Sequence, residues 1–535
     1  MTIHEYIVIG SGCSGAMVAQ TLIEKGAKVM LLDAGKEKSE AHVIPDVDFT
    51  SLRKTDKQQF RYLIGENAEG VVWGKVGKGE QVTPPRRHML QSVESHIPVD
   101  SENFSSLESL GYGGLGIGWG LQCWEYSVKD MKSAGLNPES MSKAYETVGS
   151  RIGISATKDD AAAYTIGSLK TYDDSPEMDR NHKYLYKKYL EERAYFNDRG
   201  YHMGRTPLAL ITQDRPGRKK YAYRDMDFYS DNDKSAWRPW ITVDVLKKNP
   251  GFSYVGGYLV VLFREKKDYV EIVCVGMEDN KKRIFYCRRL VLAASALGSG
   301  RLVLRSLGTN DSLPILCNPY SYVPTVQPRF VGKEIESRKL GFTQLSMFLD
   351  KNNDNSNVSV ASLYSYQSLM LFRLIRHLPL NFVDARVIMR YLMTGLVIMG
   401  IHHPDSVSLH KRISLVANTS TPTSDQLHID YALTDTELRE NKRRTSDFIK
   451  SMRKLGAYSK GSIDPGNGAS IHYAGTVPFS DSDKPFTLTP TGRLRGTKSI
   501  YVADSSGFRY LPAPGLTFSL MANAHLTAEA AFNHA

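Results

Sequence analysis

A glycine-rich turn near the start of the chain has residue types and spacing that predict chemistry. Gly10, Gly12, Ser14 and Gly15 lie in a Gly-x-Gly-x-x-Gly order, and Asp33 follows 18 residues after the last glycine. The glycines permit a tight turn, let the backbone approach a pyrophosphate, and let a helix pack closely on a strand. The helix N-terminus then faces the phosphates, and the carboxylate accepts hydrogen bonds from ribose hydroxyls. We predict a dinucleotide site here; a tight turn without a ligand is the alternative.

The residues around this turn predict the first half of a doubly wound α/β sheet. Apolar residues favour strands at 6–9 and 29–32, and the stretch 16–25 between them has the apolar spacing of a helix. Strand-like segments return at 259–263, 270–275 and 284–292, separated by charged turns. We therefore expect a nucleotide-binding domain that the chain leaves and re-enters.

The bulk composition is that of a globular protein with two cooperating domains. The chain has 535 residues, of which 41% are hydrophobic and 23% charged, with a net charge of +11. Its five cysteines are scattered without a Cys-x-x-Cys pair, so we expect neither a disulfide framework nor a metal site. The first strand candidate begins at Glu5, which leaves no room for a secretion signal. We expect a cytoplasmic protein without a nucleic-acid partner, with peripheral attachment to the inner membrane face as an open alternative.

Three further segments resemble the glucose-methanol-choline (GMC) oxidoreductases, in the order in which that family has them. They are a second glycine run at 113–120, an alanine-rich segment at 291–299 and a closing segment at 501–513. The resemblance implies an α/β fold in which a Rossmann-like FAD-binding domain is interleaved with an α+β substrate-binding domain. It implies FAD-binding parts at 1–150, 246–310 and 456–535, and substrate-binding parts at 151–245 and 311–455.

The same resemblance implies further residues that contact FAD. They come from the second glycine run, the alanine-rich segment, the closing segment and the start of the terminal helix: Gly113, Gly114, Gly118, Ala294, Ser295, Asp504 and Thr517. For Ala294 and Ser295, plain packing between strand and helix is an equal alternative. Some relatives attach FAD covalently through a histidine at the place of Gly118, so the resemblance implies non-covalent FAD.

His472 is the catalytic candidate, with Tyr473 beside it. The residues from 470 to 476 look like the family's His-x-x-Gly motif, whose histidine sits over the flavin. Such a histidine can accept a hydroxyl proton while the carbinol hydrogen leaves as hydride to flavin N5. Many relatives have Asn or His where this chain has Gly515, so a second catalytic side chain is missing; Tyr473, Asn523 and His525 are the candidates to replace it. A buried histidine satisfied by backbone is the alternative for His472.

The resemblance implies FAD-dependent oxidation of a CH–OH group of a small-molecule sugar, polyol or hydroxylated lipid. Two other functions stay open. The missing side chain at Gly515 suggests a redox-neutral rearrangement that uses FAD. A binding protein that docks lipid or membrane through a degenerate flavoprotein fold is the third possibility.

The stretch 369–401 is the most apolar part of the chain, and it carries basic residues at three- or four-residue spacing: Arg373, Arg376, His377, Arg386 and Arg390. No uninterrupted apolar run in it is long enough to span a bilayer. A helical hairpin in the membrane interface, or a lid over a lipid-like substrate, fits this pattern. Two amphipathic helices packed against the substrate-domain sheet are the alternative.

Overall fold

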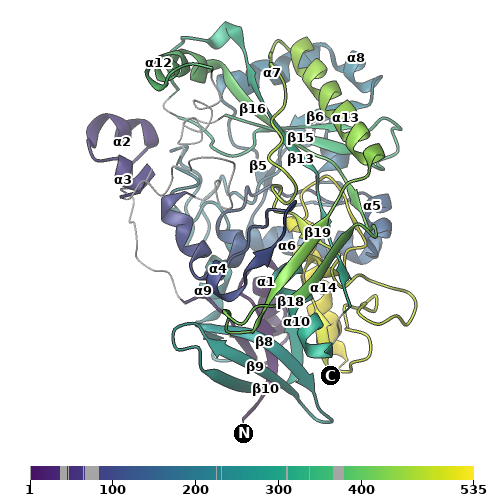
Figure 1. The fold of residues 1–535 in the computed structure, drawn as a ribbon. Helices are drawn as coiled ribbons and strands as arrows, with labels where there is room; N and C mark the ends of the chain where they lie inside the picture. Colours follow the sequence, from purple (N-terminus) through teal and green to yellow (C-terminus); the bar gives the residue numbers. More distant parts are fainter. Residues whose placement is uncertain are drawn as a thin grey trace.

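The computed structural model describes residues 2–36, 45, 47–63, 65–66, 83–224, 226–230, 232–308, 311–336, 338–365 and 379–534. The basic residues Arg373, Arg376 and His377 lie outside these ranges. Figure 1 shows two regions, one at each end of the molecule, each built around its own sheet.

The first region contains a seven-stranded sheet in which the N-terminal strands lie between other strands. Its order is β7 (Phe252–Val255), β2 (Val29–Leu32), β1 (Ile3–Ile9), β10 (Lys282–Leu292), β9 (Val270–Gly276) and β8 (Tyr258–Glu265), with β21 (Ile500–Val502) also paired to β10. β1 runs parallel to β2 and β10, whereas β8, β9 and β10 form an antiparallel meander. The predicted strands 6–9, 29–32, 259–263, 270–275 and 284–292 all lie within these elements, which confirms the doubly wound arrangement.

Helices cover this sheet. α1 (Cys13–Glu24) connects β1 to β2 and packs on the C-terminal helix α14 (Thr517–Asn533), which also contacts α6 (Pro138–Ile152). α10 (Ser295–Leu307) follows β10 directly. Further short helical elements are α2 (Phe49–Thr55), α3 (Phe60–Leu63), η1 (Pro84–Leu90), α4 (Val93–His96), η2 (Gly114–Ile117), α5 (Val128–Ala134), η3 (Ala162–Tyr164), α9 (Pro239–Leu246) and η6 (Ser505–Gly507).

The second region contains a five-stranded antiparallel sheet. Its order is β13 (Tyr320–Val326), β16 (Leu396–His402), β15 (Ser359–Tyr364), β14 (Leu345–Leu349) and β6 (Tyr201–Arg205). Val397, Met399 and Ile401 share a hydrophobic cluster with residues of α7 (Arg180–Glu191) and α13 (Asp435–Lys454). Because neighbouring strand residues point to opposite faces, the even-numbered residues of β16, Leu396, Ile398 and His402 among them, lie on the other face of the sheet.

Smaller sheets complete the described part of the chain. β11 (Leu313–Pro314), β18 (Lys411–Ala417), β19 (Asp425–Tyr431) and β3 (Val99–Asp100) form one of four strands, and three two-stranded pairs are β12 (Leu316–Cys317) with β20 (Tyr473–Ala474), β17 (Asp405–Ser406) with β22 (Tyr510–Leu511), and β4 (Ser155–Ala156) with β5 (Asp173–Asp174). The other short elements are α8 (Arg193–Asn197), η4 (Pro328–Phe330) and η5 (Met393–Gly395). The pairs around β12 and β17 hold the loop that carries the candidate catalytic residue.

The apolar stretch 382–401 differs from the expected helix. α12 (Phe382–Leu392) is helical, but β16 begins at Leu396 and is a buried strand of the five-stranded sheet. A fully buried strand is a continuous apolar run, so the sequence does not distinguish it from a buried helix. The helical hairpin is therefore wrong for this half of the stretch; the half from 369 to 378 lies outside the described residues.

Candidate active site

A large cavity lies at the carboxyl ends of β1, β2 and β10. Its empty space, the part open to solvent included, amounts to about 2090 Å³. In open α/β sheets, ligands bind in the crevice at this edge. Twelve of the predicted site residues line it: Gly10, Gly12, Ser14, Asp33, Gly114, Gly118, Ala294, Ser295, His472, Tyr473, Asp504 and Thr517. Gly15 and Gly113 lie behind the wall and shape it.

The first glycine turn has the geometry of a phosphate cradle. Gly10 has φ +98°, and a Cβ on Gly15 would lie 1.8 Å from the Gly10 carbonyl oxygen, so strand and helix approach as closely as the motif predicts. A Cβ on Gly12 would meet nothing nearer than 4.0 Å. No described side chain caps the N-terminus of α1, whose first N–H groups therefore stay available to an anion. Gly113 donates its N–H to Ser11 Oγ at 2.8 Å and ties the second glycine run to this turn.

Two buried carboxylates border the cavity and organise its backbone. Asp33 accepts N–H bonds from Ser11 and Gly35. Asp504 accepts hydrogen bonds from the Ser299 hydroxyl and from the backbone and hydroxyl of Ser506. Burial raises the pKa of both carboxyls. Each is placed to accept bonds from ligand hydroxyls while it fixes the turn beside it.

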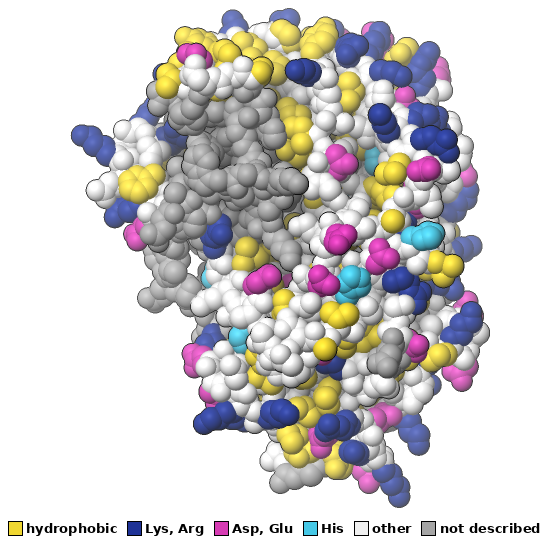
Figure 2. Space-filling view, viewed as in Figure 1, with side chains coloured by type: hydrophobic (Ala, Val, Ile, Leu, Met, Phe, Trp, Pro, Cys, Tyr) yellow, Lys and Arg dark blue, Asp and Glu magenta, His cyan; other side chains and the backbone are white. Residues whose placement is uncertain are grey.

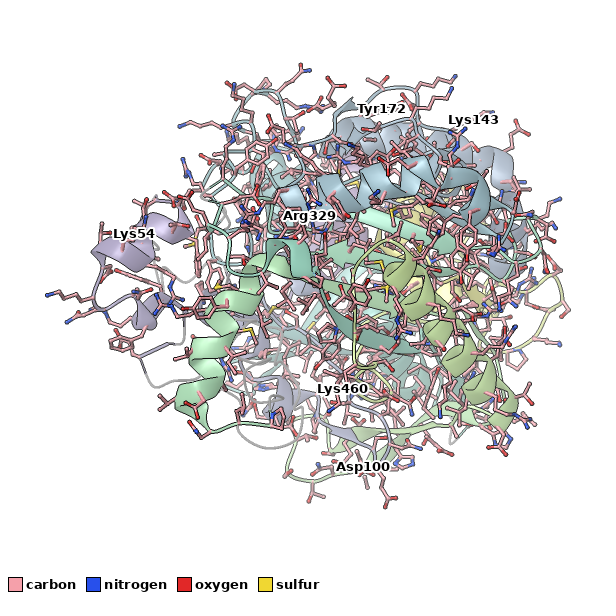
Figure 3. The ribbon with its side chains drawn as sticks, turned by 90° about the horizontal axis from the view of Figure 1, so that it is seen from above. Lys54, Asp100, Lys143, Tyr172, Arg329 and Lys460 are labelled. Atoms are coloured by element: carbon pink, nitrogen blue, oxygen red, sulfur yellow. The ribbon has the colours of Figure 1, made fainter. Side chains whose placement is uncertain are left out.

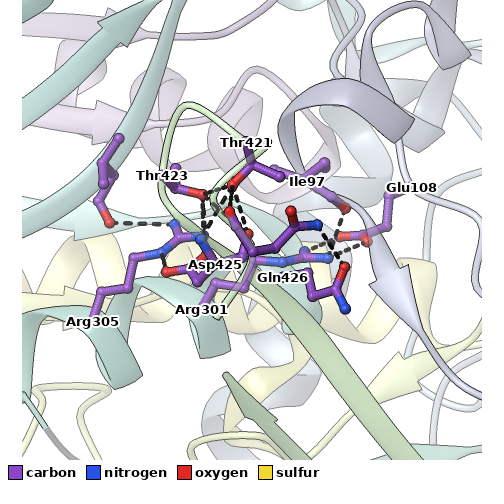
Figure 4. A network of polar contacts seen from close by, with 10 residues as sticks. Ile97, Glu108, Arg301, Arg305, Thr421, Thr423, Asp425 and Gln426 are labelled. Carbon is purple, nitrogen blue, oxygen red and sulfur yellow. Dashed lines mark hydrogen bonds and ion pairs between the residues drawn. The ribbon is translucent and has the colours of Figure 1, made fainter. Parts of the chain in front are cut away.

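Two ion pairs hold α10 in place at the cavity wall (Figure 4). Arg301 makes a two-pronged contact with Glu108 at 2.5 and 2.8 Å, and Arg305, one turn later, pairs with Asp425 at 2.6 and 2.7 Å. Arg301 and Glu108 are 2% and 6% exposed, so each neutralises the other in a buried setting. No sequence motif indicates these pairs.

The side chain of Asn318 holds the His472 ring through its Nδ1 atom. β12 pairs with β20 with Cys317 opposite Tyr473, and this antiparallel register places Asn318 opposite His472. Their side chains meet, with Nδ1 of the imidazole 3.0 Å from Oδ1 of the amide. Burial lowers the pKa of His472 to about 4, so the ring is neutral at pH 7. The residue before it, Ile471, has φ +61°, a strained conformation for a β-branched side chain.

A second imidazole lies against the first. The His402 ring stacks on His472 with 5.0 Å between centroids and 22° between planes, and the Tyr320 ring also packs on His402, with 4.6 Å between centroids. His402 is 8% exposed and its Nδ1 is buried without a partner among the described residues. Burial and the neighbouring His472 hold the pKa of His402 well below its ordinary value, so this ring also stays neutral.

The other catalytic candidates differ in where they lie relative to the cavity. Gly515 lines the cavity, and a Cβ there would lie 3.7 Å from His472 Cε1, so the missing side chain does belong beside the imidazole. The Tyr473 hydroxyl accepts a bond from Leu107 N–H and donates to Gly468 O, both at 2.9 Å, an arrangement that favours a scaffolding role. Asn523 and His525 lie inside α14, where His525 contacts Thr21, and neither lines the cavity.

The sequence interpretation missed Asn318, His402 and Gln122. Gln122 lines the cavity and donates its amide hydrogens to Thr343 and Ser362 of the second region at 2.7 and 2.9 Å. Asn318 is 154 residues from His472, and none of the three belongs to a recognisable motif. Only the tertiary structure brings them to the site.

Comparison with known proteins supports the fold. No protein-family model and no curated protein sequence matches the chain. Among solved structures, pyridoxine 4-oxidase from Mesorbium loti matches with a TM-score of 0.57 at 14% identity, over 99% of this chain and 100% of its own. An FAD-dependent oxidoreductase from Chaetomium thermophilum matches with a TM-score of 0.58 at 13% identity, over 98% of each chain. The expected GMC-type architecture is confirmed at the level of the fold, and over its whole length this chain has the fold of FAD-dependent oxidoreductases.

Proposed function

We propose that the protein holds FAD in this cavity and oxidises a CH–OH group, with Nε2 of His472 as the general base. The observation that carries the proposal is the hydrogen bond between Asn318 and His472. It decides which ring nitrogen can accept a proton.

The contacts of Asn318 fix the orientation of its amide. Its Nδ2 donates to the carbonyl oxygens of His403, Leu511 and Pro512 at 2.8, 3.4 and 3.0 Å. A swapped amide would bring oxygen against these three acceptors, so Oδ1 must face His472. Because Oδ1 only accepts, Nδ1 of His472 carries the hydrogen and Nε2 keeps its lone pair.

The residues present fit FAD. The glycine turn and the open N-terminus of α1 suit a pyrophosphate, Asp33 suits the ribose hydroxyls, and the N-terminus of α14 at Thr517 reaches the same cavity. Gly118 has no side chain to form a bond with the ring, so FAD is held without a covalent link. Bound there, FAD would supply the acceptor for the hydride that leaves the substrate's carbinol carbon.

Residues of the chain then accept the hydroxyl proton of the substrate and stabilise its charge. Nε2 of His472 takes it as the carbonyl of the product forms. Asn318 Oδ1 accepts from Nδ1–H throughout, and this bond becomes stronger when the ring is charged. The neutral His402 stacked on His472 adds no opposing charge.

The second region supports a substrate with several hydroxyl groups. Both amide hydrogens of Gln122 are used by Thr343 and Ser362, which leaves its Oε1 as an acceptor for a second substrate hydroxyl. Trp124, whose ring would lie 3.6 Å from a Cβ on Gly515, packs edge to face on Phe348 with 6.0 Å between the ring centroids. A sugar or polyol, which carries a further hydroxyl to donate to Gln122 Oε1, suits this arrangement.

Anaerobic reduction of the bound flavin tests the proposal. The purified protein should carry FAD, and its absorbance should bleach when a sugar or polyol from a panel is added without oxygen. His472→Ala should keep the flavin and lose bleaching, whereas His428→Ala, an exposed histidine paired with Asp100, should bleach normally. Equal bleaching rates in wild type and His472→Ala would refute the role of His472.

A redox-neutral rearrangement is the second candidate function. The observation that favours it is Gly515, because the side chain that relatives have beside the catalytic histidine is missing. Product formation from a sugar without any electron acceptor, and with no net reduction of the flavin, would support it over oxidation.

A further inference from the structure

The outward side of α12 is apolar although it faces solvent. Val383 and Tyr391 are each 60% exposed, and Leu380, Val387 and Ile388 are between 40% and 46% exposed. Residues 383, 387 and 391 follow at four-residue spacing and so form one continuous stripe. Figure 2 shows hydrophobic side chains gathered along the upper edge of the molecule, over α12.

The stripe is not needed to hold α12 on the protein. The opposite side of the helix does that, because Ala385 and Met389 are buried and Met389 clusters with Leu396 and Ile398 of β16. One side of α12 thus packs on the five-stranded sheet, as expected of an amphipathic helix. The exposed stripe is apolar surface in addition to that contact, and contiguous exposed apolar surface marks an interaction site.

Positive side chains accompany the stripe. Arg390 is exposed on α12 itself, and Arg329 and Lys333 are exposed on the loop whose Gly332 donates its N–H to Tyr391 O at 3.0 Å. The exposed acidic neighbours are Asp384, which caps the helix with Asn381, and Glu334. Figure 2 shows Lys and Arg side chains beside the hydrophobic ones along this edge.

A second element of the same character lies on the same side. α2 and α3 carry Phe60, which is 46% exposed, together with the exposed cations Arg53, Lys54 and Lys57. In both Figure 1 and Figure 3, α2 and α12 project on the same side of the molecule. A flat surface can therefore contact both elements at once.

We propose that α12, with α2 and α3 beside it, docks the protein on an anionic bilayer surface. An apolar helix stripe edged by Lys and Arg is the pattern of a helix that lies in the membrane interface. None of the helices in the described ranges has the length and apolar character that a membrane span needs. The overall charge of +11 adds long-range attraction to anionic lipid.

Docking through α12 places the active site near the membrane. η5 joins α12 directly to β16, whose last residue, His402, stacks on His472. Leu396, Ile398 and His402 share one face of β16, and its seven residues span about 20 Å. The catalytic imidazole then lies about that far from the docking helix.

Vesicle flotation with the full-length flavoprotein tests the docking surface. The protein should float with vesicles of phosphatidylcholine mixed with an equal amount of phosphatidylglycerol, and not with phosphatidylcholine alone. Raised salt should weaken the association, because exposed charges are screened. Val383→Glu/Tyr391→Glu should lower the bound fraction about tenfold or more, since two apolar side chains no longer enter the interface.

Matched controls separate docking from folding and from self-association. Val245→Glu changes a 62% exposed residue on α9 and should float as wild type does. Light scattering of the same proteins reports whether copies associate. The proposal is overturned if wild type fails to float with anionic vesicles, if the double variant floats like wild type, or if the stripe supports only a dimer of this chain in solution.

Discussion

Asn318→Leu is the sharpest test of the site. The substitution keeps a side chain of similar size but removes the acceptor for His472 Nδ1–H and the donor for three backbone carbonyls. The His472 hydrogen is then no longer fixed on Nδ1, so fewer molecules present a lone pair at Nε2. We expect slower reduction of the flavin by substrate, with the flavin itself still bound.

The contacts set the size of the effect. A hydrogen bond of this kind contributes about 0.5–1.5 kcal/mol net, and a factor of ten in rate corresponds to about 1.4 kcal/mol. The rate of flavin reduction should therefore fall by about two- to tenfold. The unpaired buried carbonyls should cost about 1–3 kcal/mol of unfolding free energy.

Stopped-flow flavin reduction from neutral pH down to pH 4 separates positioning from stability. Burial lowers the pKa of His472 to about 4, so in the wild type the rate should fall as the pH approaches that value. Because Asn318 also stabilises the charged ring, its loss lowers this pKa further, and Asn318→Leu should keep a larger share of its plateau rate at pH 4.

The matched control for this variant is Asn181→Leu. Asn181 is a buried amide that donates to Thr394 O at 2.9 Å and does not line the cavity. It should lower the melting temperature without changing either the plateau or the acid limb. If Asn318→Leu shows the wild-type rate and the wild-type acid limb, the tautomer argument is wrong.

Three other properties follow from the same structure. Burial lowers the pKa of His472 to about 4 and that of His403 to about 3 in the folded protein. The unfolded chain, in which both histidines have their ordinary pKa of 6.5, therefore binds more protons below pH 6.5. The melting temperature should fall as the pH drops from 6.5 toward 4. Gly15→Ala puts a Cβ 1.8 Å from a backbone oxygen, and should lose bound flavin, read from absorbance, with a destabilisation of about 1–3 kcal/mol or more. Arg301→Met leaves the Glu108 carboxylate buried without its partner and should cost about 3–5 kcal/mol in urea unfolding.

Each of these has a control. A melting temperature that stays constant between pH 6.5 and pH 4 would contradict the first. Gly26→Ala has φ +87° but meets no atom within 4 Å, so it should cost about 1–2 kcal/mol from strain alone and keep its flavin. Arg301→Met/Glu108→Leu leaves no buried charge and should recover most of the lost stability; a double variant as unstable as the single one would refute the ion-pair explanation.

The nucleotide half of the protein could be predicted from the sequence because its signals are local. The turn at Gly10 to Gly15, the apolar strands on either side and Asp33 all lie within one short stretch, where spacing alone reports strand, turn and helix. His472 was found by its place among motifs, and the structure does bring it to the cavity edge beside Gly515.

The segment around α12 and β16 shows where local signals fail. β16 is apolar along most of its length and α12 is apolar between its few charged residues, and the sequence favours helix for both. The strand exists because Leu396–His402 finds partners on both sides, in β13 and β15, and a helix there would leave those edges unpaired. Apolar character alone predicts that a segment is buried. It does not predict whether the segment pairs with neighbouring strands or packs as a helix.

By itself, the sequence predicted the Rossmann-like turn and the α/β class, because both rest on neighbouring residues, and the order of its motifs indicated His472 as the candidate base. Only the tertiary structure shows that Nδ1 of this histidine is bonded to Asn318, which leaves Nε2 as the nitrogen able to accept a proton. Asn318 and His472 meet through a pairing of two-residue strands, β12 and β20, across 154 positions of chain. Strands this short have no sequence pattern of their own, so their register depends on the packed domains around them.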